Sequence, residues 1–147
     1  MSERITLDRA NAIIAGSFAK ALDLRLRPLT VAVLDAGGHL IALQRQDGSS
    51  TLRAQIAVGK AAGALALGMS SRKLGEMASE RPSFVASLSA LSTQGIVPAA
   101  GGVIVIGQNG APIGAVGATG DTSDNDELCV LAGIAEAGAE AQKCGRT

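Results

Sequence analysis

Aromatic side chains are almost absent from this chain of 147 residues, which has no Trp, no Tyr and only two Phe, at positions 18 and 84. Proteins that hold single-stranded nucleic acid stack the bases on aromatic rings, and this sequence offers no such platform. An excess of charge is absent as well, because 13 Lys and Arg residues balance 13 Asp and Glu residues. Without a net field to attract phosphate groups or anionic lipid, we expect neither a nucleic-acid partner nor a membrane partner.

Long apolar runs are missing too. No segment approaches the roughly 20 apolar residues that a bilayer-spanning helix requires. The first four residues, Met-Ser-Glu-Arg, do not resemble the start of a secretory signal. These absences predict a cytoplasmic protein.

Two residue types with useful chemistry are scarce. Cys129 and Cys144 are the only cysteines, and both fall in one predicted C-terminal helix, where fifteen residues span roughly 22 Å. A disulfide cannot form at that separation, so we expect two reduced thiols. His39 is the only histidine, and it is either a solvated turn residue or the source of any imidazole that a mechanism needs.

Glycine, in contrast, is abundant, with 19 residues and no regular period, which is about twice the usual share of roughly 7%. These glycines permit tight turns and close packing. The length and the absence of an internal repeat favour one domain over residues 1–147.

Turn residues and hydrophobic periodicity predict the order helix, hairpin, several helices, hairpin, helix. The expected strands cover 29–34, 39–45, 103–106 and 112–119, and Asn109-Gly110 forms the second hairpin turn. The expected helices cover 7–26, 51–67, 70–81, 83–91 and 124–143, with Thr6, Ser50 and Asp124 as N-caps. Because hairpins require antiparallel pairing, the predicted class is α+β, with a central antiparallel sheet of four to five strands flanked by helices.

A lysine inside the most apolar helix is the first candidate for a binding role. Lys60 follows Arg53 by seven residues, which places both cations within about 20° on one helical face. Charged groups are almost never buried without a partner. Lys60 therefore either pairs with an acidic side chain or carbonyls, or faces a pocket that receives an anion.

Other candidates lie at strand ends. Arg45 and Asp47 close the first hairpin, where a guanidinium suits carboxylate recognition as well as an ordinary ion pair. Gly101 and Gly102 precede a strand, where unhindered amides would allow an anionic or planar ligand to approach.

Two further patterns favour structural roles. The glycines at 114, 117 and 120 are more typical of close helix packing than of a ligand loop. Acidic residues crowd the start of the last helix, where Asp124 with Glu127 approximates a capping box. This acidic cluster lacks the His, Cys or calcium-loop spacing of a metal site, so we expect no metal.

Five short segments, in this order and spacing, resemble the GlcG/HbpS-like family: Val33–Gly38, Gln44–Gly48, Gly59–Ala62, Pro98–Val103 and Ile113–Gly117. The resemblance implies an α/β domain that assembles into dimers and higher oligomers, commonly octamers. Its members include haem-binding proteins, glycolate-utilisation accessory proteins and the C-terminal domain of PduO-type adenosyltransferases, which makes haem the candidate cofactor.

The family pattern, carried over by position, includes Asp35, Gly38, Arg45, Asp47, Lys60, Gly101, Gly102 and Asp126. Gln46 stands where the family usually has an apolar residue, and Ala100 stands where it has proline. Met69 and Met77 are more typical of a core than of axial haem ligands.

Two hypotheses of different class follow. The first is an oligomeric protein, from dimer to octamer, that binds a tetrapyrrole or a small oxygenated organic acid through Arg45, Arg53, Lys60, Gly101 and Gly102. The second is an isomerase, tautomerase or lyase acting on a small organic acid, with His39, Asp47 or Glu127 moving a proton. A structural or accessory subunit without a ligand is the remaining alternative.

Overall fold

The structure, a computed structural model, describes residues 3–143 and places five strands of this range in one antiparallel sheet. In chain order these are β1 (Thr30–Asp35), β2 (Leu40–Arg45), β3 (Gly102–Ile106), β4 (Pro112–Thr119) and β5 (Glu140–Ala141). Their order across the sheet is β2-β1-β4-β3-β5. The two hairpins join because β1 pairs with β4, with Thr30 opposite Thr119. The predicted α+β class and antiparallel sheet are confirmed.

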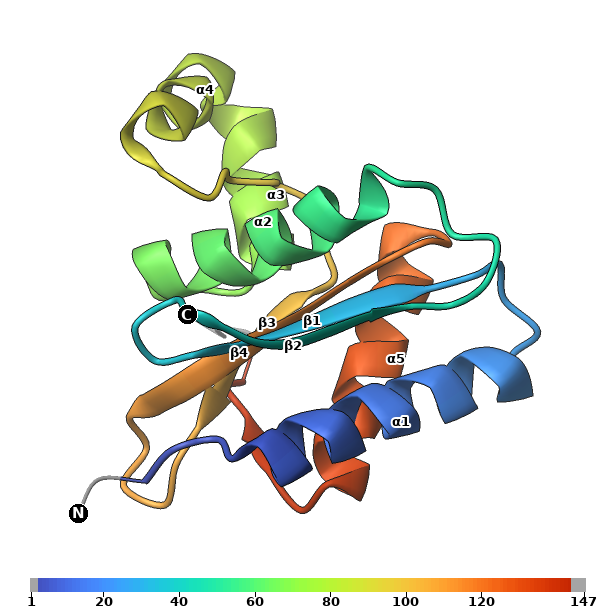
Figure 1. The fold of residues 1–147 in the computed structure, drawn as a ribbon. Coiled ribbons are helices and arrows are strands. Elements are labelled where there is room, and N and C mark those ends of the chain that lie inside the picture. The colour runs from blue at the N-terminus through green and yellow to red at the C-terminus, as the bar shows by residue number, and fades with distance from the viewer. Residues whose placement is uncertain (1–2, 144–147) are drawn as a thin grey trace.

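Helices cover both faces of the sheet (Figure 1). The helices α1 (Leu7–Asp23) and α5 (Ser123–Glu136) pack on one face, and α2 (Arg53–Leu67) packs on the other. The shorter helices α3 (Ser71–Glu80) and α4 (Pro82–Leu88) and the 3-10 turn η1 (Ser89–Leu91) follow α2. Within the part of the chain that the structure describes, no helix is both long enough and apolar enough to cross a membrane.

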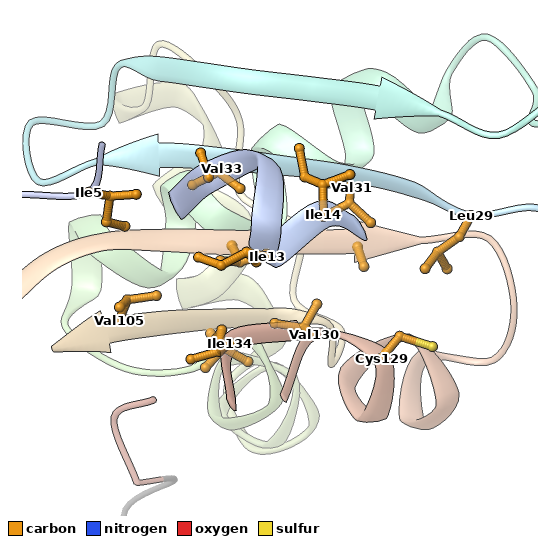
Figure 2. Close-up of a cluster of buried hydrophobic side chains, with 14 of the residues drawn as sticks. Ile5, Ile13, Ile14, Leu29, Val31, Val33, Val105, Cys129, Val130 and Ile134 are labelled. Carbon is orange, nitrogen blue, oxygen red and sulfur yellow. The ribbon is translucent and has the colours of Figure 1, made fainter. Parts of the chain in front are cut away.

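The main core lies between the sheet and the α1–α5 pair. Alternate residues of β1, Val31 and Val33, point into it, as strand geometry requires. Isoleucines from the two helices fill the space above them, among them Ile13, Ile14 and Ile134 (Figure 2). A smaller apolar cluster with Leu34 lies on the α2 side.

Close packing of α2 depends on a missing side chain in β4. A Cβ atom built on Gly117 would collide with the carbonyl oxygen of Ala57 and would lie 3.0 Å from the backbone nitrogen of Ala61. The helix backbone therefore rests directly on the strand backbone. The prediction that glycines in this strand serve close helix packing is confirmed at Gly117.

Several predicted helix ends are wrong. The last helix ends at Glu136 and not at 143, because Gly138 adopts the left-handed conformation, with φ at 72°, and the chain turns back to form β5. Thr122 caps this helix in place of Asp124, since its hydroxyl accepts from the Asn125 N–H at 3.2 Å. The helix α2 begins at Arg53, and Ser50 is not its side-chain cap. Cys144, predicted to lie in the last helix, is outside the described residues.

Two glycine-to-alanine substitutions test the packing of α2. We expect Gly117→Ala to lower the free energy of unfolding by about 1–3 kcal/mol or more, because the added methyl overpacks the helix–strand contact. Gly63→Ala is the matched control, since its new Cβ would meet neighbours at 3.5 Å, an ordinary contact distance. In mid-helix that change should stabilise the protein by roughly 0.5–1 kcal/mol. Urea unfolding of both variants measures the difference, and equal effects would refute the packing argument.

Candidate functional site

Three strands bring polar side chains together at one end of the sheet. Thr30 at the start of β1 lies opposite Arg45 at the end of β2 and opposite Thr119 at the end of β4. Residues directly opposite each other in a sheet point to the same face, and here that face is covered by α2. Because α2 begins at Arg53, a second guanidinium reaches the same end.

One hydroxyl group and one backbone oxygen hold these arginines in place. The Arg53 Nη1 donates to the Thr119 Oγ1 at 2.7 Å, and the Arg45 Nη1 donates to the backbone oxygen of Ser49 at 3.3 Å. The hydroxyls of Thr30 and Ser49 bond each other at 2.6 Å. We call these five residues the arginine site.

Neither guanidinium of the arginine site has a carboxylate partner in the described part of the chain. Among residues 3–143, the ion pairs formed by arginine involve Arg27 and Arg72, and no carboxylate is paired with Arg45 or Arg53. Thr30 and Thr119 are fully buried beneath them. Arg53 is anchored on the buried Thr119 hydroxyl and Arg45 on the Ser49 backbone oxygen, and both guanidiniums keep N–H donors that these bonds do not use.

Arg45 also lines an open pocket of about 370 Å³. Asp47 lies in the same pocket, together with Leu43, Gln46, Gly48 and Ser49. The structure thus brings two of the predicted site residues, a guanidinium and a carboxylate, into one depression at the edge of the sheet.

Lys60 is satisfied inside the protein. Its side chain is 3% exposed, and its Nζ donates to the backbone oxygen of Ala118 at 3.0 Å and to the Asp126 Oδ2 at 3.4 Å. The other oxygen of Asp126 accepts from the Asp121 N–H at 2.9 Å. The structure therefore contains the internal pairing, which was one of the two alternatives for Lys60.

Burial sets the electrostatics of this pair. Desolvation lowers the pKa of Lys60, the neighbouring Asp126 opposes that shift, and the nearby Arg53 adds to it. Desolvation likewise raises the pKa of Asp126, while its hydrogen bonds and Lys60 oppose the change. Both shifts have the same physical cause, which is the loss of water around each charge.

Gly101 and Gly102 pack against Lys60. A Cβ on Gly101, where φ is 130°, would lie 2.9 Å from the Lys60 Nζ. The Gly102 N–H donates to the Ser71 Oγ at 2.7 Å. These glycines make room for the buried ammonium, and the Gly102 amide has a protein acceptor.

The remaining predicted residues lie elsewhere. Glu127 accepts from the Arg72 Nε at 3.0 Å, and Arg72 also pairs with Asp124. His39 is at the opposite end of β2, 81% exposed, with its Nδ1 3.3 Å from the Asp35 Oδ1. Six residues of strand separate it from the arginine site, which is about 20 Å.

Local sequence patterns did not indicate which side chains contact the candidate residues. Arg72 was not singled out, and Thr119 carried no signal beyond its place at a strand end. Asp126 was identified through the family pattern, but its partner Lys60 is 66 positions away. No local spacing reveals such a contact.

Cys129 is a buried thiol in α5. Burial, with Asp126 and Asp121 nearby, raises the pKa of Cys129 to about 11. The thiol therefore stays protonated at neutral pH and belongs to the core, as expected of a structural cysteine.

The sheet order, the helices on both faces and the glycine pair at 101–102 define the class of protein, which is a single-sheet α+β domain. Residues 5–135 match the family described as Haem degrading protein HbpS-like. The chain belongs to this HbpS-like family, which confirms the resemblance stated from its sequence.

Relatives support the same assignment. The chain is 33% identical over 124 residues to an uncharacterised 15.0 kDa protein of Citrobacter freundii encoded between dhaT and dhaS, covering 84% of this chain and 85% of that protein. The crystal structure of a double mutant of HbpS from Streptomyces reticuli superposes with a TM-score of 0.79 at 27% identity, covering 92% and 88% of the two chains. A crystal structure of PduOC in complex with haem gives 0.84 at 18% identity, over 96% and 100%, and shows the shared fold.

Removing the counter-charge of Lys60 tests the internal pair. We expect Asp126→Asn to lower the free energy of unfolding by about 3–5 kcal/mol, because it leaves a buried ammonium without a charged partner. Asp124→Asn on the same helix is the control, since this carboxylate is exposed and surface pairs contribute about 0–1 kcal/mol. Chemical unfolding of both variants gives the comparison, and equal losses would contradict the structural role.

The same variant has a defined pH dependence. Without Asp126, the pKa of Lys60 falls further below its ordinary value, so the unfolded chain binds more protons than the folded one up to about pH 10. The free energy of unfolding of Asp126→Asn should therefore rise with pH, starting from a lower pH than in the unmodified protein. Unfolding curves measured between neutral and alkaline pH would show this slope, and a flat profile would exclude it.

Proposed function

We propose that this protein binds a small molecule carrying at least one carboxylate, and that the arginine site receives it. The observation that supports the proposal is the pair of guanidiniums, Arg45 and Arg53, which have hydroxyl and carbonyl partners but no carboxylate partner within residues 3–143. Arginine forks match the two oxygens of a carboxylate, and charge-assisted bonds of this kind are the stronger class. The ligand is a small oxygenated organic acid or the propionate edge of a tetrapyrrole.

Haem is the tetrapyrrole that the relatives suggest. The family description names haem degradation, and PduOC was crystallised with haem. Haem iron takes an axial ligand such as His or Met. The arginine site contains neither, and His39 lies at the other end of β2. The arginine site therefore fits the propionates of haem and not its iron.

A binding assay with charge-removed variants tests the proposal. Isothermal titration with a panel of mono- and dicarboxylic acids and with haem should identify a ligand of the unmodified protein. Arg45→Gln and Arg53→Gln should each weaken that ligand about tenfold or more, since a hydrogen bond to a charged group contributes about 1.5–3 kcal/mol. Arg9→Gln, on α1 at the opposite face of the sheet from α2, is the matched control and should bind normally.

Two results would overturn the proposal. One is a panel in which no carboxylate binds. The other is a ligand whose affinity is the same in Arg45→Gln, Arg53→Gln and Arg9→Gln. Haem that binds with unchanged affinity in both site variants would place the tetrapyrrole elsewhere on the chain.

A second candidate is an enzyme of the isomerase, tautomerase or lyase type, favoured by one observation. Asp47 shares the 370 Å³ pocket with Arg45, so a carboxylate able to move a proton lies beside a carboxylate anchor. We expect Asp47→Asn to keep ligand affinity and to lose proton exchange between bound ligand and solvent by about 10²–10⁴-fold. Deuterium exchange followed by NMR on the ligand found above decides this, and unchanged exchange would remove the enzyme hypothesis.

A further inference from the structure

Gln46, the residue that follows β2, is held by hydrogen bonds at every polar group except one. Its backbone N–H donates to the oxygen of Leu29 at 2.9 Å, and its backbone oxygen accepts from the Ser49 N–H at 3.1 Å. Its side-chain Oε1 accepts from the Leu29 N–H at 2.8 Å. Among residues 3–143, its Nε2 has no hydrogen-bond partner. The carboxamide is therefore held in place while both hydrogens of its NH2 group are unused.

The bond to Leu29 also fixes which end of the carboxamide is free. Leu29 is fully buried, so its N–H requires an acceptor inside the protein. Only the oxygen of a carboxamide accepts, whereas its NH2 group only donates. A rotated carboxamide would set two donors against each other and leave the buried N–H without a partner, which costs free energy. The NH2 group is thus the end that remains for a ligand.

This donor belongs to the same pocket as the candidate carboxylate anchor. Gln46 lines the pocket of about 370 Å³ together with Arg45 and Asp47. Arg45 and Gln46 are consecutive, so their Cα atoms are about 3.8 Å apart. Asp47 has no hydrogen bond or ion pair with any described residue. The lining therefore combines a guanidinium, an uncharged double donor and an unpaired carboxylate.

We propose that Gln46 determines which acids this pocket selects, by donating to an oxygen on the carbon atom next to the ligand's carboxylate. The ligand class is then a 2-oxo or 2-hydroxy acid. Two consecutive residues suit two functional groups on adjacent carbon atoms, with Arg45 holding the carboxylate and Gln46 holding the second oxygen. The inference rests on the proposed function, because the carboxylate has to be bound at Arg45.

The chemistry of the lining explains the selection. A plain monocarboxylate has no acceptor for the Gln46 NH2 group, so it would displace water from that donor without replacing the bond. A carbonyl or a hydroxyl oxygen on the next carbon supplies the acceptor. A hydroxyl can in addition donate to the Asp47 carboxylate, which a carbonyl cannot do.

Three-carbon acids that differ only at the second carbon test the selectivity. In isothermal titration, pyruvate and lactate should each bind the unmodified protein about two- to tenfold more tightly than propionate, as expected of one neutral hydrogen bond. Tighter binding of lactate than of pyruvate would assign the second oxygen to a hydroxyl that also contacts Asp47, and the reverse order would assign it to a carbonyl. Pyruvate that binds no more tightly than propionate would overturn the proposal.

Gln46→Glu isolates the contribution of the NH2 group. A glutamate keeps an oxygen for the Leu29 N–H but has no donor, so the midpoint of urea unfolding should stay close to that of the unmodified protein. The added charge weakens both acids, and the preference for pyruvate over propionate should fall to about one, because pyruvate loses its neutral hydrogen bond. A residue with only a structural role would not change this ratio. An unchanged ratio in Gln46→Glu would refute the role of the NH2 group.

Two further variants complete the test. Gln44→Glu is the matched control, since it makes the same chemical change at an exposed side chain that does not line the pocket, and it should keep the preference for pyruvate. Gln46→Met removes the acceptor as well as the donor. It should lose the preference and also lower the midpoint of urea unfolding, because the buried Leu29 N–H then lacks its partner.

Failure of this selectivity is distinguishable from failure of the proposed function. If no carboxylate binds the unmodified protein, the proposed function fails and the selectivity fails with it. If the acids bind and depend on Arg45, but the unmodified protein does not prefer pyruvate to propionate, the proposed function stands. Gln46 then serves only to satisfy Leu29 at the end of the strand pair.

Discussion

The ion pair between Lys60 and Asp126 holds the two sides of this fold together. Lys60 belongs to α2 on one face of the sheet, and Asp126 belongs to α5 on the other face. They meet near the start of β3 and the end of β4, where the oxygen of Ala118 accepts a further bond from the ammonium. A buried charge pair costs desolvation free energy that only good geometry offsets. Here the pair ties the middle of α2 to the first turn of α5.

This arrangement determines which cations are free for a ligand. The ammonium of Lys60 is used internally, and Gly101 leaves the space that it occupies. The nearby guanidinium of Arg53 has a hydroxyl partner in Thr119 and no counter-charge among the described residues. The buried pair thus sets the position of the helix that carries Arg53, and the hydroxyls at the strand ends orient its side chain. The core and the site are connected through one helix.

Much of the fold was predictable, because its signals are local. Asn109-Gly110 and the Asp35–Gly38 turn each specify a hairpin, and the continuous apolar run of β1 indicates a strand that is covered on both faces. The end of α5 was not predictable from periodicity, since the residues after Glu136 continue the small, apolar pattern and only Gly138 interrupts it. At the site, the types of Arg45, Asp47 and Arg53 make them candidates from the sequence alone. The partner of Lys60 and the distance of His39 from the arginine site could not be predicted, because both depend on contacts between segments remote in the sequence.

The two margins of the sheet are unequal. At the β3 side, the chain returns as a strand of only two residues, β5, and the Gln142 N–H then bonds the oxygen of Ile104 at 2.7 Å. A margin shortened and covered in this way resists further strand addition. Growth by strand addition therefore has one available direction and ends when that direction is used. Such a molecule is protected from building open-ended fibrils through its sheet.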